Sequence, residues 1–228
     1  NYFDTPISFT LAIAFAADFA DIFEVRGLER RARGHFLGTE VSKQHVAMAY
    51  RGLDKVVRRT VIHADAPPHT LTETGLVYQI ALPAHGEQEL RLHVEFVCAE
   101  RRGTVHPYEE VQAHSAETLS RRRAGDCQLV SSNAQFNNWL ERSQSDLHML
   151  TTYTDHGAFP YAGIPWFSTP FGRDSIITAL EYLWINPAIA RGVLSYLAAH
   201  QAHEVNPEQE AEPGKIFHEL RKGEMAAL

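Results

Sequence analysis

The chain has 228 residues, of which 44% are hydrophobic and 21% charged, and its net charge is −7. These proportions are those of a folded globular protein and exclude a disordered chain or a collagen-like repeat. The acidic balance argues against a nucleic-acid partner, because phosphate binding needs a basic surface. The longest apolar run, residues 9–20, is shorter than the roughly 18 residues that a membrane-spanning helix needs. We therefore expect no membrane partner.

The two cysteines and the two ends of the sequence give two further expectations. Cys98 and Cys127 lie in different segments and have no spaced partners, which indicates a reducing compartment. A cytoplasmic location is therefore expected. The sequence begins at Asn1 without an initiator methionine or a signal-peptide pattern, and residues 223–228 look like the start of a further helix. We expect it to be a piece of a larger protein.

The first half alternates apolar and polar residues with a period of two, at residues 46–50, 76–82 and 90–98. Such alternation predicts half-buried strands of antiparallel sheets. Residues 9–26 form a long apolar run, for which we predict one or two strands buried on both faces. Short strands at close spacing favour a β-sandwich, which we place at residues 1–115. The polar stretch 116–130 is predicted to be a linker, partly helical in one interpretation.

From residue 131 the apolar period becomes 3.6, typical of amphipathic helices. Ser132 and Gln135 form a capping-box pattern, so we predict that a helix begins there. A second helix is predicted at residues 174–185, and Pro187 suits the first position of a third helix. The short turn between the last two predicts an antiparallel pair. Residues 131–228 are thus interpreted as the incomplete start of a helical domain.

A long stretch between two of these helices, residues 159–175, is a candidate binding loop. It concentrates aromatic residues, including Tyr161 and Trp166, beside Arg173 and Asp174. Aromatic faces can cover the apolar face of a sugar ring, while a carboxylate accepts and a guanidinium donates hydrogen bonds to hydroxyl groups. The alternative is that Asp174 or Ser175 only caps a helix and that the aromatic residues fill a core.

A second candidate stretch, residues 212–224, holds His218, Glu219, Arg221 and Glu224. Glycoside hydrolysis uses two carboxyl groups as acid and base, so Glu219 and Glu224 are weak candidates for that pair. Fully extended, they would lie about 16 Å apart, and only a turn at Gly223 could bring them together. The alternative is an exposed acidic loop.

His200, His203 and Glu204 are a third candidate group, with the residue types of a metal site. Their spacing is not that of a recognised zinc hydrolase, and a polar helix end explains them equally well. Neither a glycine-rich phosphate loop nor a Gly-x-Ser-x-Gly elbow is present. We therefore expect neither a metal ion nor a cofactor.

Three stretches of the sequence, residues 19–27, 161–175 and 212–224, are similar to those of a known protein family. The sequence resembles the bacterial glycogen debranching, amylo-α-1,6-glucosidase type family, and more distantly the glucoamylase-type (α/α)6 barrel glycosidases. The resemblance implies an α+β multi-domain protein, with an N-terminal antiparallel β-sandwich followed by the first helices of a truncated (α/α)6 toroid. It also implies inverting hydrolysis of terminal α-glucosyl linkages in an α-glucan or oligosaccharide.

The resemblance assigns substrate binding to both candidate stretches. Arg173 and Asp174 would grip the terminal glucose, with Trp166 and Tyr161 beside them. A family loop near the pocket is matched by His218, Glu219 and Arg221. In relatives the general acid and base come from later loops, so this chain alone is expected to be inactive. Its exposed helix faces would favour self-association.

Two alternatives remain open at this point. A related (α/α) barrel enzyme with trehalase-like or mannosidase-like activity would use the same Arg173–Asp174 pair, because that pair reads the terminal sugar and not the linkage. A non-catalytic carbohydrate-binding module would bind sugar without turnover. The sequence alone does not separate these functions from α-1,6-glucosidase activity.

Overall fold

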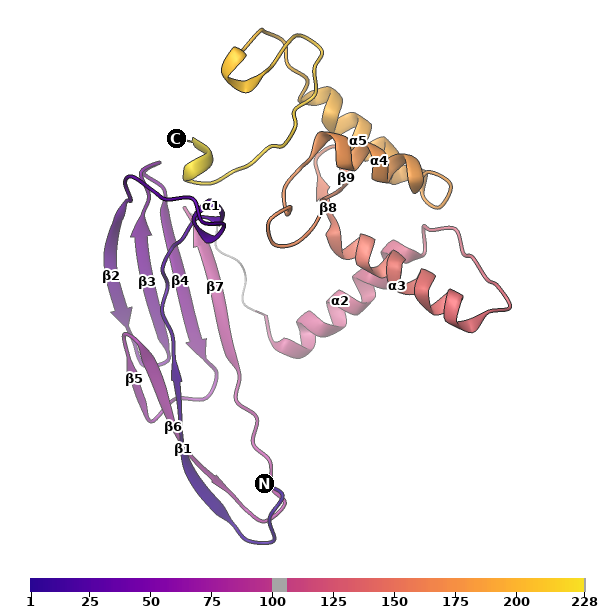
Figure 1. The fold of residues 1–228 in the computed structure, drawn as a ribbon. Helices are drawn as coiled ribbons and strands as arrows, with labels where there is room; N and C mark the ends of the chain where they lie inside the picture. Colours follow the sequence, from indigo (N-terminus) through magenta and orange to yellow (C-terminus); the bar gives the residue numbers. More distant parts are fainter. Residues whose placement is uncertain (100–105, 228) are drawn as a thin grey trace. The chain divides into compact units, whose positions relative to one another are not determined.

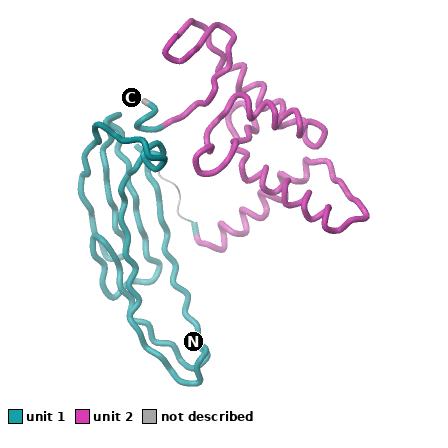
Figure 2. The backbone as a smooth tube through the Cα atoms, in the orientation of Figure 1, with its two compact units in different colours: residues 1–106, 223–228 teal, residues 107–222 magenta. Residues whose placement is uncertain are grey.

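The computed structural model describes residues 1–99 and 106–227. The chain divides into two compact units (Figure 2), which are residues 1–106 with 223–228, and residues 107–222. Helix α2 (Tyr108–Arg123) lies at the start of the second unit and includes residues 116–123 of the predicted linker.

The first unit is built on two antiparallel sheets (Figure 1). The smaller sheet has the strand order β1-β6-β5, and the larger has the order β2-β3-β4-β7. Every pair of neighbouring strands runs antiparallel, as the period of two predicted. The strands are β1 (Ile7–Ala14), β2 (His35–Val41), β3 (His45–Arg51), β4 (Val57–Ala64), β5 (Thr70–Thr72), β6 (Gly75–Leu82) and β7 (Leu92–Cys98).

One apolar cluster connects the two sheets. Leu76, Tyr78 and Ile80 alternate along β6 and pack with Ala64 at the end of β4. The Tyr78 hydroxyl lies at the edge of this cluster and donates a hydrogen bond to the carbonyl of Ala66 at 2.9 Å. Leu76, Tyr78 and Ile80 are apolar members of the predicted alternation, so the core face of β6 follows from the sequence. In β7 the alternation predicts the wrong face, because Val94 and Phe96 are 52% and 77% exposed whereas Val97 is only 4% exposed.

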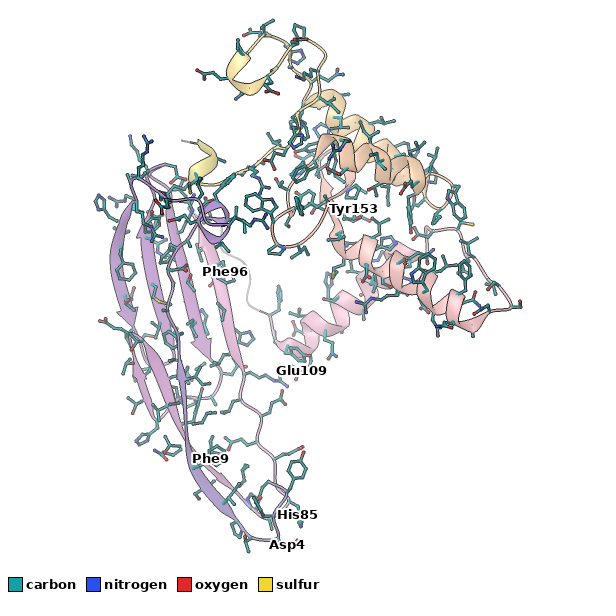
Figure 3. The ribbon with its side chains drawn as sticks, viewed as in Figure 1. Asp4, Phe9, His85, Phe96, Glu109 and Tyr153 are labelled. Carbon is teal, nitrogen blue, oxygen red and sulfur yellow. The ribbon has the colours of Figure 1, made fainter. Side chains whose placement is uncertain are left out.

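The prediction that residues 9–26 form one or two strands buried on both faces is wrong. Strand β1 ends at Ala14, and all its residues are exposed or only partly buried. Phe9, labelled in Figure 3, remains 45% exposed. Further along, Ile22–Val25 forms the short helix α1, because Asp21 and Glu24 make a reciprocal capping box that favours a helical turn.

The second unit is mainly helical. Its helices are α2 (Tyr108–Arg123), α3 (Ala134–Leu150), α4 (Gly172–Glu181) and α5 (Pro187–Ala199), with a 3-10 turn η1 (Pro207–Gln209). A second 3-10 turn, η2 (Met225–Ala227), belongs to the first unit. A short hairpin that the sequence analysis missed follows α3, formed by β8 (Thr151–Thr154) and β9 (Gly157–Pro160).

The helix starts differ in detail from the predicted ones. Asn133, not Ser132, caps α3, and its side chain accepts a hydrogen bond from the Phe136 amide at 3.0 Å. Helix α5 begins at Pro187 as predicted, behind the Asn186 cap. An Asn side chain reaches the free amides of a first turn as well as Ser does, so the apolar period alone could not choose between neighbouring polar residues.

Helix α4 begins at Gly172, before the predicted start at Asp174, with Phe171 at the cap position. Neither Asp174 nor Ser175 caps this helix. The Ser175 hydroxyl is buried and donates instead to the carbonyls of Phe171 and Gly172. Asp174 is therefore not needed to start the helix.

The core of the second unit lies where α5 packs on the hairpin. Phe159 and Val193 are fully buried there. A Cβ atom on Gly192 would lie 2.2 Å from the carbonyl oxygen of Ala158, so the backbones of α5 and β9 are in direct contact. By contrast, Leu180 and Trp184 are 69% and 62% exposed. Self-association through such faces, and the toroid itself, stay predictions.

No helix in residues 1–99 and 106–227 combines the length and the apolar character needed to cross a bilayer.

Candidate functional site

The two stretches singled out in the sequence meet within the second unit. Phe171 and Glu219 form an antiparallel bridge. Beside it, the Gly172 amide donates to the carbonyl of His218 at 3.0 Å. The start of α4 is therefore held against residues 218–219 by backbone hydrogen bonds, and the candidate side chains of both stretches project from one small region.

Gly172 is what allows this close approach. A Cβ atom at this position would lie 2.3 Å from the carbonyl oxygen of Phe217, which is far inside van der Waals contact. We expect Gly172→Ala to lower the free energy of unfolding of the second unit by about 1–3 kcal/mol, the usual cost of overpacking. Chemical denaturation followed by tryptophan fluorescence measures it, because all three tryptophans lie in this unit.

The matched control is Gly163→Ala in the same loop, where the added Cβ would meet Phe167 only at an ordinary 3.7 Å. Equal destabilisation by the two substitutions would show that the contact at Gly172 is not what holds the stretches together.

Arg221 is the centre of the side-chain cluster at this junction. Its Nε donates to Glu219 Oε2 at 2.8 Å, and its Nη1 donates to the carbonyl of Trp166 at 3.0 Å. The guanidinium also lies over the Trp166 ring, 4.2 Å from its centroid, and 5.9 Å from that of Phe171. Two hydrogen bonds and a cation–π contact hold the guanidinium in one orientation. Glu219 remains 31% exposed and can accept a hydrogen bond from a ligand.

Arg173 and Asp174 lie in the first turn of α4 and face solvent. Their side chains are 73% and 37% exposed, and Arg173 Nη2 lies 3.9 Å from Asp174 Oδ1. At that distance the pair shares no hydrogen bond. A carboxylate in a first helical turn is favoured by the partial positive charge of the helix N-terminus. Both groups are therefore accessible to a hydroxylated ligand.

The other predicted binding residues differ in their exposure. His218 is exposed, and its ring meets that of Phe171 edge to face at 5.8 Å. Tyr161 is only partly buried and packs on the core cluster, with its ring 6.4 Å from that of Phe159. Tyr161 thus helps to attach the loop to the core, whereas His218 presents its ring at the surface.

Glu224 lies elsewhere. It belongs to the first unit and is 3% exposed. Its carboxylate pairs with Arg30 and accepts hydrogen bonds from the Tyr50 hydroxyl at 3.1 Å and the Leu53 amide at 2.7 Å. Glu219 belongs to the second unit, where its carboxylate accepts a hydrogen bond from Arg221. Each glutamate therefore has its own partners within its own unit.

The sequence analysis missed a buried polar cluster around Asp126. His148 Nε2 lies 2.7 Å from Asp126 Oδ2, the Tyr182 hydroxyl donates to the same oxygen at 2.6 Å, and the Asn186 side chain donates to Oδ1 at 2.8 Å. Burial, with the hydrogen bond to Asp126 second, raises the pKa of the Tyr182 hydroxyl far above its usual value. The cluster joins the connection after α2 to the ends of α3 and α4 and the start of α5.

A cavity of about 680 Å³ lies between α2, α3 and the connection between them. Leu119, Leu129 and Leu140 contribute to its apolar wall, and Arg123 and Glu141 are among its polar lining residues. The predicted sugar-binding residues do not line it. The candidate site around the start of α4 is therefore separate from this cavity.

The histidines considered as metal ligands do not form a site. The His200 ring stacks on Tyr196 at 4.1 Å, and its Nδ1 lies 2.8 Å from the Tyr196 carbonyl oxygen. Within residues 1–99 and 106–227, no group of three or more His, Cys, Asp or Glu side chains could hold a metal ion.

The fold is thus α+β, with an antiparallel β domain in one unit and a helical unit that carries the candidate site. Residues 1–93 match the family model described as the N-terminal domain of (some) glycogen debranching enzymes. This match confirms the predicted relationship to debranching enzymes for the N-terminal portion of the chain, and the candidate site lies beyond it. No curated protein matches the chain.

Proposed function

We propose that the chain is part of a glycoside hydrolase of the debranching type, which cleaves terminal α-glucosyl linkages of glycogen-like glucans with inversion. The observation that carries this proposal is the match of residues 1–93 to the N-terminal domain of glycogen debranching enzymes. The helical unit would then be the beginning of an (α/α)6 toroid. A chain of this type takes a glucan as its substrate.

The start of α4 supports a role in binding the sugar. Arg173 and Asp174 are adjacent, exposed and not hydrogen-bonded to each other. A sugar hydroxyl donates one hydrogen bond and accepts others, so a carboxylate beside a guanidinium can hold two neighbouring hydroxyls. We infer that Arg173 and Asp174 bind the non-reducing terminal glucose.

The cluster around Arg221 supports the same function. Arg221 is 10% exposed and is fixed by Glu219 and Trp166. A ligand that meets side chains already held in place loses less affinity to their ordering. We infer that Glu219 accepts a hydrogen bond from the substrate, while Arg221 positions Glu219 and the indole of Trp166.

Asp174→Asn tests this proposal in the protein expressed at its full natural length. We expect glucose release from glycogen limit dextrin to fall by about 100-fold or more, the loss seen when one charged hydrogen bond to a transition state is removed. Thermal unfolding should stay unchanged, because the Asp174 side chain neither caps α4 nor fills its core.

The matched control is Glu181→Gln, which removes an exposed carboxylate at the other end of the same helix and should leave the rate unchanged. Near-normal activity of Asp174→Asn would end the assignment of this residue. If the full-length wild-type protein releases glucose only from trehalose or an α-mannoside, the debranching function itself fails.

We also propose a cytoplasmic location. Cys98 and Cys127 are both free and exposed. Exposed thiols persist in reducing compartments, whereas secreted proteins tend to pair them.

A further inference from the structure

The cavity between α2 and α3 is bounded by one face of each helix. The lining residues on α2 are spaced at i, i+3, i+4 and i+7, and those on α3 follow the same spacing. Residues at this spacing lie on one side of a helix, so both helices turn a single face toward the cavity. These residues are Ala116, Leu119, Ser120 and Arg123 on α2, and Asn137, Leu140, Glu141 and Gln144 on α3.

The connection between the two helices forms a further wall of the cavity. Ala124 and all of residues 126–130 line it. The Cys127 amide donates to the carbonyl of Ile185 at 2.9 Å, and Asp126 accepts a hydrogen bond from the Tyr182 hydroxyl at 2.6 Å. These contacts attach the connection to the end of α4, so this wall is held in place by the fold of the second unit.

The size of the cavity shows that its lining side chains do not fill it. Its volume is about 680 Å³, whereas protein interiors contain few voids larger than a water molecule. Pockets that bind small ligands have volumes of about 300–1,000 Å³. Ser120 and Gln128 in the lining are exposed, so the cavity is open to solvent and a ligand can enter it.

Each of the three walls contributes one leucine. Leu119 lies on α2, Leu129 on the connection and Leu140 on α3, and all three are partly buried. An apolar group placed among them would remove their remaining accessible surface from water, which favours binding. The cavity therefore suits a ligand with an apolar body.

The polar lining favours an uncharged ligand. Arg123 Nη2 donates to Glu141 Oε1 at 2.9 Å, and Asp126 is hydrogen-bonded within its buried cluster. The charged lining residues are thus one guanidinium and two carboxylates, and they already have partners. Gln128 and Gln144 also line the cavity, and a side-chain amide both donates and accepts hydrogen bonds. An anion would meet a wall with an excess of negative charge, whereas a neutral hydroxyl, amine or amide would not.

We propose that the cavity between α2 and α3 binds an uncharged amphipathic small molecule. Its apolar body lies against Leu119, Leu129 and Leu140, and its polar group hydrogen-bonds to Gln128 or Gln144. The site is independent of the proposed sugar-binding residues, which do not line this cavity.

The test is fluorescence titration of the 228-residue chain with N-phenyl-1-naphthylamine, an uncharged probe with aromatic rings and one N–H group. We expect saturable binding to one site. Ala116→Phe places a large side chain in the cavity and should weaken binding by at least about tenfold, since overpacking of this kind costs 1–3 kcal/mol. The matched control is Ala113→Phe, because Ala113 is exposed on the same helix and does not line the cavity. This variant should bind the probe as the wild type does.

A second probe tests the charge of the ligand. 8-Anilinonaphthalene-1-sulfonate has the same ring system with an added sulfonate, and we expect it to bind this cavity at least about tenfold more weakly, because like charges repel. The signal from the cavity is the part that Ala116→Phe removes. Equal or tighter binding of the sulfonate there would overturn the assignment of an uncharged ligand.

Far-UV circular dichroism shows whether each variant keeps its helices. If Ala116→Phe does not fold, Leu119→Trp decides the question, because it also enlarges a lining side chain. Absence of saturable binding of the uncharged probe to the wild-type chain would overturn the proposal. Unchanged affinity in a folded cavity-filling variant would overturn it as well, since the probe would then bind elsewhere.

Discussion

Replacing Asp126 by alanine is expected to lower the free energy of unfolding of the second unit by about 3–5 kcal/mol. The side chains of Asp126 and His148 are 3% and 2% exposed, so water cannot replace the lost carboxylate. Tyr182 and Asn186 would also lose their acceptors. A buried polar group without a partner costs more than the net value of the hydrogen bond that it made.

Denaturant unfolding followed by tryptophan fluorescence measures this effect, because Trp139, Trp166 and Trp184 all lie in the second unit. Asp126→Asn should lose less than Asp126→Ala, since the amide keeps one acceptor oxygen and nearly the same volume. The control is Glu141→Ala. Its carboxylate pairs with Arg123 but is 61% exposed, so its removal should cost no more than about 1 kcal/mol. Equal losses for Asp126→Ala and Glu141→Ala would contradict the structural role of the cluster.

The elements that the sequence predicted correctly are those with a local physical signal. The start of α5 follows from Asn186 and Pro187, which fix a cap and the first helical turn within two positions. The strands predicted at residues 46–50, 76–82 and 90–98 follow from alternation of apolar and polar residues, as in the eight residues of β6. The hairpin Thr151–Pro160 was missed because each of its strands has only four residues, too few to show a period.

The residue types of the candidate site were predictable from the sequence, but the contact between its two stretches was not. Aromatic and charged residues in 159–175 and 212–224 marked both stretches, but the bridge between Phe171 and Glu219 is a tertiary contact with no local signal. Glu224 was grouped with Glu219 because the two are close in sequence, whereas the structure places them in different units.

Strand register shows, in the first unit, a second case in which the sequence could not predict which residues lie side by side. His45, His63 and His93 are separated by turns and by whole strands, and only the pairing of β3, β4 and β7 brings them into one row. A shift of one residue would move a histidine to the other face of the sheet. Spacing along the chain therefore could not indicate these residues as a group.

Glu224→Ala is expected to lower the free energy of unfolding of the first unit by about 3 kcal/mol. The substitution leaves the Arg30 side chain, itself only 5% exposed, without its buried partner. The Tyr50 hydroxyl and the Leu53 amide lose an acceptor at the same time. Breaking a buried ion pair from one side costs about 3–5 kcal/mol, and we expect the lower end because Arg30 keeps its hydrogen bond to Glu24 at 3.1 Å.

Hydrogen exchange measured by mass spectrometry on peptides from β3 follows this loss, because the first unit contains no tryptophan. The control is Glu219→Ala, which removes a partly exposed carboxylate from the second unit and should leave exchange in β3 unchanged. A structural Glu224 predicts faster exchange in Glu224→Gln as well, because the amide cannot neutralise Arg30. If Glu224 were catalytic instead, its substitution would abolish glucose release by the full-length protein and leave exchange in β3 unaltered. That result would contradict the structural role that the buried contacts of Glu224 indicate.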